Sequence, residues 1–236
     1  MNPSDELLVL HLQHRILDDF EKEDTNTWTT LAPESGTSTV GDSAGGVVAL
    51  AASDATIADN DEIYFYTKEV YLFAAGKPLK MYSRVQYTEG NTDDANIYVG
   101  LASGVAANFM QDNGLGPSAS FSGVGFYKVD GGLNWNVVFS VGSTQTKAEL
   151  TAVASFNRTA QVAGGAAYQN LEIEVVPTTS TLCDVYFSIN GSLVYKMNDQ
   201  VYTGATEMSA VYCSKTGGTA ANETLNVDAH YSVQKR

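Results

Sequence analysis

The sequence has few of the residues on which many protein functions depend. Its 236 residues include only two cysteines and three histidines, and two cysteines are too few for a disulfide-stabilised framework. Lysine and arginine together number 13, against 27 aspartates and glutamates, so the formal net charge is −14. A surface of that sign repels a phosphate backbone, and the basic residues are scattered singly apart from Lys235-Arg236 at the C-terminal end, so we expect no nucleic-acid binding.

Long apolar runs and a positively charged leader are also lacking. No apolar stretch approaches the roughly 18 residues that a membrane-spanning helix requires. Asp5 and Glu6 lie in the region where a signal peptide would carry positive charge. We therefore expect no export by that route and no membrane partner.

Alternating apolar and polar residues run through most of the chain. In one segment Leu171, Ile173 and Val175 share one face, and Glu172 and Glu174 share the other. This period of two is typical of a strand with one buried face. Ten or more such segments with few helix signals predict an all-β protein, a two-sheet antiparallel jelly-roll sandwich. No linker divides them, so we assign one domain to residues 18–236.

Turn residues predict how some strands are connected. Asn190-Gly191 between two apolar runs is the strongest hairpin signal, and residues 130–132 separate another pair of strands. The last strand is predicted to place one set of side chains inward, namely Leu225, Val227, Ala229, Tyr231 and Val233. Its other face would hold Asn226, Asp228, His230 and Ser232. Cys183 and Cys213 each share a phase with apolar neighbours, which favours two buried free thiols, possibly on neighbouring strands, over a disulfide.

Residues 1–17 differ from the rest and are predicted to form an N-terminal arm or a short helix. Ser4 can cap a helix, on which Leu8, Leu12 and Ile16 would form one apolar stripe. An extended arm fits the same residues equally well. The segment could dock on another protein or pack on its own sandwich, and the pattern does not separate these two alternatives.

The search for catalytic or metal-binding residues gives weak candidates. Glu172 and Glu174 face the same way on one strand, but two acids also simply keep a strand face hydrated. The three histidines, His11, His14 and His230, form no zinc-ligand pattern and are expected to face solvent. The oxygen-rich segments 59–62 and 91–96 could bind calcium or merely form turns. We therefore predict no enzyme activity, no cofactor and no resident metal.

The succession of strands resembles the concanavalin A-like, laminin-G-like jelly roll. The residues that carry this resemblance are Asp18-Asp19-Phe20, Trp28, the run 123–127 before Trp135, the run 168–175, and the strand and hairpin at 185–194. The resemblance covers residues 18–234, and it implies a fold rather than a function.

Within that superfamily the chain resembles the capsid decoration (cement) proteins of tailed bacteriophages. This resemblance implies a virion structural protein, assembled in the host cytoplasm, that binds the outside of the phage head as a homo-oligomer. It would stabilise contacts between subunits of the major capsid protein. The candidate docking residues are those of the apolar arm, Leu7, Leu8, Leu10 and Leu12.

The alternative function is a carbohydrate-binding or host-adhesion module, because jelly rolls of this type commonly bind sugars through aromatic platforms. Thirteen tyrosines are available. The tyrosines that could line an outer face for a glycan are Tyr64, Tyr66, Tyr71, Tyr82 and Tyr127. Exposed tyrosines serve protein interfaces equally well.

Overall fold

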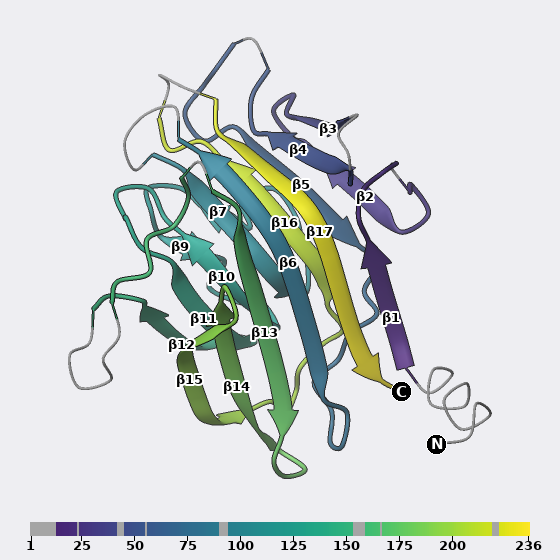
Figure 1. Ribbon diagram of the computed structural model, residues 1–236. Coiled ribbons are helices and arrows are strands. Elements are labelled where there is room, and N and C mark those ends of the chain that lie inside the picture. The colour runs from purple at the N-terminus through teal and green to yellow at the C-terminus, as the bar shows by residue number, and fades with distance from the viewer. Residues whose placement is uncertain are drawn as a thin grey trace.

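The computed structural model describes residues 13–22, 24–41, 45–54, 56–89, 94–152, 159–165, 167–218 and 222–236. These residues form 17 strands and no helix, which confirms the all-β prediction (Figure 1). Within the same ranges no helix is therefore long and apolar enough to span a membrane.

The larger sheet has eight antiparallel strands. Its order is β15-β14-β13-β6-β17-β4-β3, and β1 pairs with the part of β17 that β4 leaves free. The strands are β1 (Gln13–Asp18), β3 (Thr37–Gly41), β4 (Val47–Ala51), β6 (Leu79–Thr88), β13 (Gln169–Pro177), β14 (Leu182–Ile189), β15 (Ser192–Val201) and β17 (Thr224–Lys235). The first and last strands thus lie side by side, and the C-terminus lies beside the start of β1.

The second sheet has seven strands in the order β12-β11-β10-β7-β16-β5-β2. They are β2 (Trp28–Leu31), β5 (Glu62–Thr67), β7 (Asn96–Ala102), β10 (Gly123–Lys128), β11 (Asn136–Val141), β12 (Thr144–Glu149) and β16 (Ser209–Lys215). A small pair, β8 (Met110–Gln111) and β9 (Gly116–Pro117), belongs to the connection between β7 and β10. The two large sheets face each other as a sandwich, as predicted.

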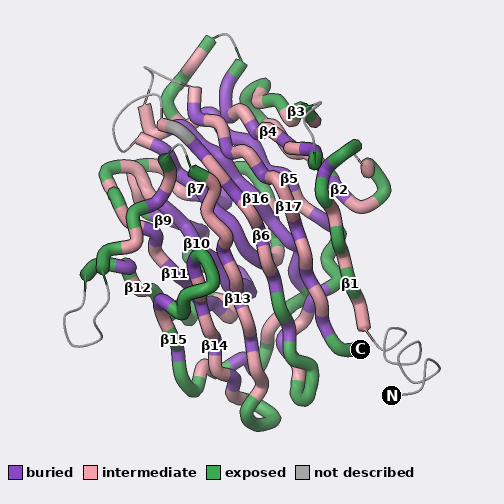
Figure 2. The backbone as a smooth tube through the Cα atoms, in the orientation of Figure 1, coloured by how far each residue is buried: buried purple, intermediate pink, exposed green. Residues whose placement is uncertain are grey.

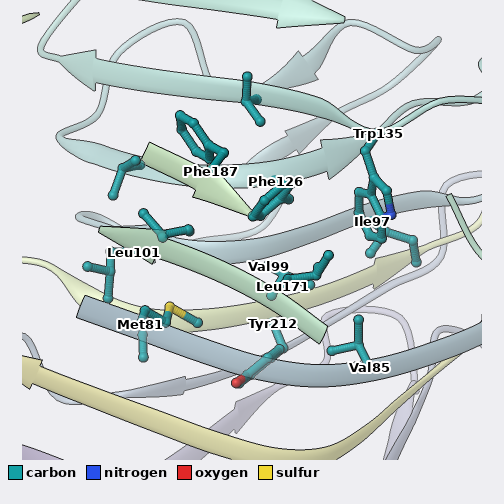
Figure 3. Close-up of a cluster of buried hydrophobic side chains, with 14 of the residues drawn as sticks. Met81, Val85, Ile97, Val99, Leu101, Phe126, Trp135, Leu171, Phe187 and Tyr212 are labelled. Carbon is teal, nitrogen blue, oxygen red and sulfur yellow. The ribbon is translucent and has the colours of Figure 1, made fainter. Parts of the chain in front are cut away.

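The main hydrophobic core fills the space between the two sheets (Figure 3). Phe126 of β10 packs edge-to-face on Phe187 of β14, with ring centroids 5.3 Å apart, and this contact joins the sheets. Trp135 lies against Phe126 on the other side, at 6.1 Å. Exposed residues are concentrated in the connections and at the margins, while the central strands are buried or half-buried (Figure 2).

Local turn chemistry behaves as predicted at both hairpins. Asn190 and Gly191 adopt φ angles of 52° and 75° between β14 and β15. Two successive positive φ angles are the requirement of a type I′ turn, which Asn-Gly satisfies at little cost. Strands β10 and β11 also pair as a hairpin, and Pro177 is the last residue of β13.

The last strand departs from the predicted alternation at Asp228. Its register against β6 shifts between Val227 and Ala229, which marks a β-bulge. The extra residue exchanges the two faces of the strand, because side chains alternate with a period of two. His230 and Ser232 are therefore fully buried, and Tyr231 is turned outward. The prediction that His230 faces solvent is wrong for this reason.

The residues that the bulge turns inward form a buried hydrogen-bond chain. The Tyr212 hydroxyl lies 2.7 Å from both the Ser83 hydroxyl and Nδ1 of His230. Nε2 of His230 lies 2.6 Å from the Ser232 hydroxyl, which also contacts the Tyr71 hydroxyl. The chain connects β16 of one sheet to β6 and β17 of the other, so every polar group on it is satisfied inside the core.

The start of the described chain is a strand. Residues 13–17, which the sequence pattern predicts to be part of the N-terminal arm, belong to β1 and pair with β17 along its whole length. Asp18 closes the following corner by accepting hydrogen bonds from the backbone of Phe20 at 2.8 Å and from Nε1 of Trp28 at 2.7 Å. Both aromatic rings are buried, so the carboxylate of Asp18 fastens the Asp-Asp-Phe segment to the hydrophobic core.

Both cysteines are free and buried, as predicted. Cys183 lies on β14 and Cys213 on β16, so they occupy different sheets rather than neighbouring strands. Burial raises the pKa of Cys183 to about 12, and the nearby charge of Asp184 adds to this shift. Burial likewise raises the pKa of Cys213. Both therefore stay thiols at neutral pH and act as core side chains.

Candidate functional site

The outer face of the seven-stranded sheet is covered by the protein's own chain. Residues 103–122, which connect β7 to β10, place Phe109, Met110 and Phe121 on this face. They pack with Tyr64 and Tyr98 into a second apolar cluster. The central strands of this sheet are thus buried on both sides, which explains why β5 is apolar in both phases.

A buried ammonium group holds the covering segment in place. Nζ of Lys215 lies 3.2 Å from Glu62, 2.6 Å from Asp112 and 2.9 Å from Oδ1 of Asn108. Glu62 also accepts hydrogen bonds from the Tyr64 hydroxyl and the Asn108 backbone. Burial lowers the pKa of Lys215, but Asp112 and Glu62 outweigh it and leave the pKa above its usual value. The polar groups of this cluster therefore bind one another within the fold.

The outer face of the eight-stranded sheet is open and carries a depression of about 430 Å³. Four adjacent strands, β14, β13, β6 and β17, supply its lining, and they lie side by side in Figure 1. The lining residues are Lys80, Met81, Tyr82, Glu172, Ile173, Glu174, Tyr186, Ser188 and Tyr231. Four adjacent strands are separated by three inter-strand spacings, so the depression is about 14 Å wide across the strands.

The strand register arranges the outward-facing lining residues, together with their neighbours on the same face, in two rows. The first, which we call the central row, runs across six strands as Leu193, Ser188, Glu172, Tyr82, Tyr231 and Leu17. The second, which we call the charged row, runs as Lys196, Tyr186, Glu174 and Lys80. Both ends of the central row are apolar and exposed, Leu17 by 71% and Leu193 by 59%.

Two of the three tyrosines of the depression, Tyr82 and Tyr186, are held by neighbouring polar groups. The Tyr82 hydroxyl donates to Oδ1 of Asn170 at 3.0 Å. Tyr186 donates to Asp184 at 3.4 Å, and the ammonium of Lys196 lies 4.9 Å from the centroid of its ring. Side chains that are fixed before a ligand arrives lose less entropy on binding.

Most charges on this face form ion pairs. Lys80 lies 3.3 Å from Glu174 and Lys196 lies 2.6 Å from Asp184. Farther along β6, Arg84 pairs with Asp228 and stacks on the ring of Tyr168, 4.1 Å from its centroid.

Glu172 differs from these paired groups. Within the residues that the structure describes it has no hydrogen bond or ion pair, although it lies opposite both Tyr82 and Ser188. Partial burial raises the pKa of the Tyr82 hydroxyl; Arg84 lowers it, and the negative charges of Glu172 and Asp228 raise it further.

The structure separates the five tyrosines that were predicted to share one outer face. Tyr82 lies in the depression, whereas Tyr64 and Tyr127 are buried on the opposite sheet and Tyr66 is half-buried there. Tyr71 is buried in the main core. Sequence reasoning missed Tyr186, which follows the period of two, and Tyr231, which only the bulge turns outward.

The other predicted sites are the two calcium segments and the apolar arm. Their residues either bind other groups of the protein or lie outside the described residues. Asp61, in one of the proposed calcium segments, accepts from the backbone of Ala58 and the hydroxyl of Ser53, and Glu62 binds Lys215. The described residues contain no group of three or more histidines, cysteines or acids that could hold a metal ion. Residues 91–93 and the arm residues Leu7, Leu8, Leu10 and Leu12 lie outside the described residues. The capsid-docking role, its partner and the virion location therefore stay predictions.

No protein-family model and no curated protein matches the sequence. Solved structures do match in fold. The carbohydrate recognition domain of Emp47p has a TM-score of 0.59 at 10% identity, and the match covers 92% of this chain and 93% of that one. An endo-1,3-β-glucanase from Streptomyces sioyaensis scores 0.56 at 14% identity, covering 95% and 97%. An endo-β-1,4-glucuronan lyase from the fungus Trichoderma reesei scores 0.57 at 10% identity, covering 92% and 94%.

These similarities define the class of the fold. The protein has a concanavalin A-like jelly roll, the fold that lectin-like domains and polysaccharide-cleaving enzymes share. At 10–14% identity the similarity extends to the fold alone, and a shared fold does not determine function. The function has to be argued from the open depression.

Proposed function

We propose that the protein is a carbohydrate-binding, lectin-like module and that the depression on the eight-stranded sheet is its glycan site. The observation that carries this proposal is the combination of Tyr82, Tyr186 and Tyr231 with carboxylate, ammonium and hydroxyl groups in one open hollow. Aromatic rings bury the apolar faces of a ligand, and a few polar groups around them fix its orientation.

Two further observations support this site over other surfaces. Residues 103–122 cover the central strands of the opposite sheet, whereas the depression on the eight-stranded sheet is left open by the residues that the structure describes and can accept an extended ligand. The structures of similar fold include carbohydrate recognition domains and enzymes named for polysaccharides. They favour the carbohydrate-binding alternative over binding to a phage head.

Binding without cleavage is the expected behaviour, because one of the two acids on β13 is already engaged. Glycoside hydrolysis needs one carboxyl group as an acid and a second as a base or nucleophile. Glu172 and Glu174 are the acids of the depression, and Glu174 is paired with Lys80 at 3.3 Å. We therefore expect no new reducing ends when the protein is incubated with a glycan that it binds.

The test is a glycan array probed with labelled protein, followed by titration calorimetry on the best ligand. Tyr82→Ala should weaken binding at least about tenfold, because truncation of a central aromatic anchor removes a main contact. Tyr66→Ala is the matched control, since Tyr66 is also half-buried but lies on the opposite sheet. Absence of any array ligand, or equal binding by Tyr82→Ala and the wild type, would refute the proposal.

A further inference from the structure

The charged side chains around the depression form ion pairs, except for one carboxylate. Lys80 is paired with Glu174 and Lys196 with Asp184, so the ammonium groups nearest the depression are already neutralised. Glu172 has no such partner in the described part of the chain. The hollow therefore carries one uncompensated negative charge at its centre.

Two further cations on this face, Arg84 and Arg15, are respectively paired with another acid and distant from Glu172. Arg84, next on β6, is paired with Asp228. Arg15 lies on β1, three strands from Glu172, which is about 14 Å at the usual strand spacing. Exposed charges at that separation are screened at physiological ionic strength. A ligand group that meets Glu172 thus meets a carboxylate without a competing cation.

Tyrosine rings beside Glu172 strengthen this preference for positive charge. Tyr82 lies directly opposite Glu172 on β6, and Tyr231 follows Tyr82 on β17. The faces of aromatic rings carry partial negative charge and attract ammonium groups. A carboxylate with adjacent tyrosines is a combination that favours a protonated amine and disfavours a second carboxylate.

We infer that Glu172 makes the depression select glycans that carry protonated amino groups, over neutral glycans and, most strongly, over uronic acid glycans. This inference rests on the proposed carbohydrate-binding function and names the ligand class of the same site. An amino sugar would place its ammonium group at Glu172 and its ring on Tyr82. A neutral sugar would offer only a hydroxyl at that point, and a uronate would place like charges together.

The test compares three tetrasaccharides that share the same β-1,4-linked pyranose backbone. They are the glucosamine tetramer, cellotetraose and the glucuronic acid tetramer, titrated calorimetrically at pH 6 and low salt, where primary amines are protonated. The wild-type protein should bind the glucosamine tetramer about tenfold more tightly than cellotetraose. It should bind the glucuronic acid tetramer most weakly, and 0.5 M salt should reduce the preference.

Two variants that each remove one negative charge test whether the preference for the glucosamine tetramer depends on Glu172. Glu172→Gln should bring the affinities for the glucosamine tetramer and cellotetraose to within about twofold of each other. Glu207→Gln removes the same charge from an exposed residue outside the depression and should preserve the wild-type preference. Equal effects of the two variants would show an unspecific effect of net charge and would overturn the inference.

The outcomes separate this inference from the proposed function. If cellotetraose or other array glycans bind through Tyr82 and the glucosamine tetramer has no advantage, the inference fails and the carbohydrate-binding function stands. If none of the tetramers binds, the inference is also overturned. The glycan array with Tyr82→Ala then decides separately whether the site binds carbohydrate at all.

Discussion

At the scale of single residues, burial changes the chemistry of His230. Its ring is fully buried, with Tyr212 and Ser232 at its two nitrogens, and the edge of the ring meets Trp28 at 5.1 Å between centroids. Burial lowers the pKa of His230 to about 3, because a charged imidazolium would lose its hydration in the core. The residue is therefore a neutral structural group.

The shift in the pKa of His230 predicts acid sensitivity of the fold. An unfolded chain takes up a proton at a histidine below about pH 6.5, whereas the folded protein resists protonation of His230 until about pH 3. The unfolded state thus binds more protons between these values, and the free energy of unfolding falls as the pH falls. Between pH 7 and pH 5 this residue should remove about 2 kcal/mol.

Urea unfolding at both pH values measures this effect. His230→Gln, although less stable overall, lacks the titrating group, so its loss between pH 7 and pH 5 should be smaller than that of the wild type by the same amount. Identical pH dependence in both proteins would show that His230 is not the group responsible.

At the scale of elements, residues 103–122 act as a fixed cover for the seven-stranded sheet. Their apolar side chains supply contact area, and Lys215 ties them to β5 through Glu62. The ion pair is fully buried, and such a pair is costly to break from one side because the remaining charge stays unsolvated. The cover and the sheet should therefore be stable only as a unit.

Replacement of Lys215 by methionine should lower the free energy of unfolding by about 3–5 kcal/mol, since Glu62 would be left buried without its cation. Adding Glu62→Gln to this variant should restore part of the loss. Lys196→Met breaks an ion pair on the open face and should cost far less, because water replaces the partner. Equal losses in Lys215→Met and Lys196→Met would refute the role of the buried pair.

At the scale of the whole molecule, one core joins the two sheets. Trp28 stacks on Phe65 with centroids 4.7 Å apart, and Trp135 packs edge-to-face on Tyr87 at 6.0 Å. The two tryptophans report on different parts of the same cluster. A shared core of this kind predicts cooperative unfolding.

Single-tryptophan variants test this prediction. In Trp28→Phe and in Trp135→Phe, the fluorescence of the remaining tryptophan should follow the same denaturant transition as the far-ultraviolet circular dichroism of that variant. Two separated transitions would instead show that the sandwich contains independently unfolding parts. Each variant serves as its own control, because both probes are compared in one protein.

Much of the architecture could be predicted because its causes are local. The alternation around Glu172 and Glu174 places both acids on one face, and the pair Asn190-Gly191 encodes its own turn. Apolar neighbours in the same phase were enough to predict that Cys183 and Cys213 are buried thiols. These features depend on residues within a few positions of one another.

Local patterns were therefore sufficient to predict the all-β sandwich, the two hairpins and the faces of the regular strands. Tertiary structure alone decided which face of the last strand is buried, because the bulge at Asp228 depends on pairing with β6. It also decided that Glu172, Tyr82 and Tyr231 meet in one row, and that the opposite sheet is covered. These features escape local patterns because they depend on which distant strands pair and in which register, and a shift of one residue moves the side chains of a strand to its other face.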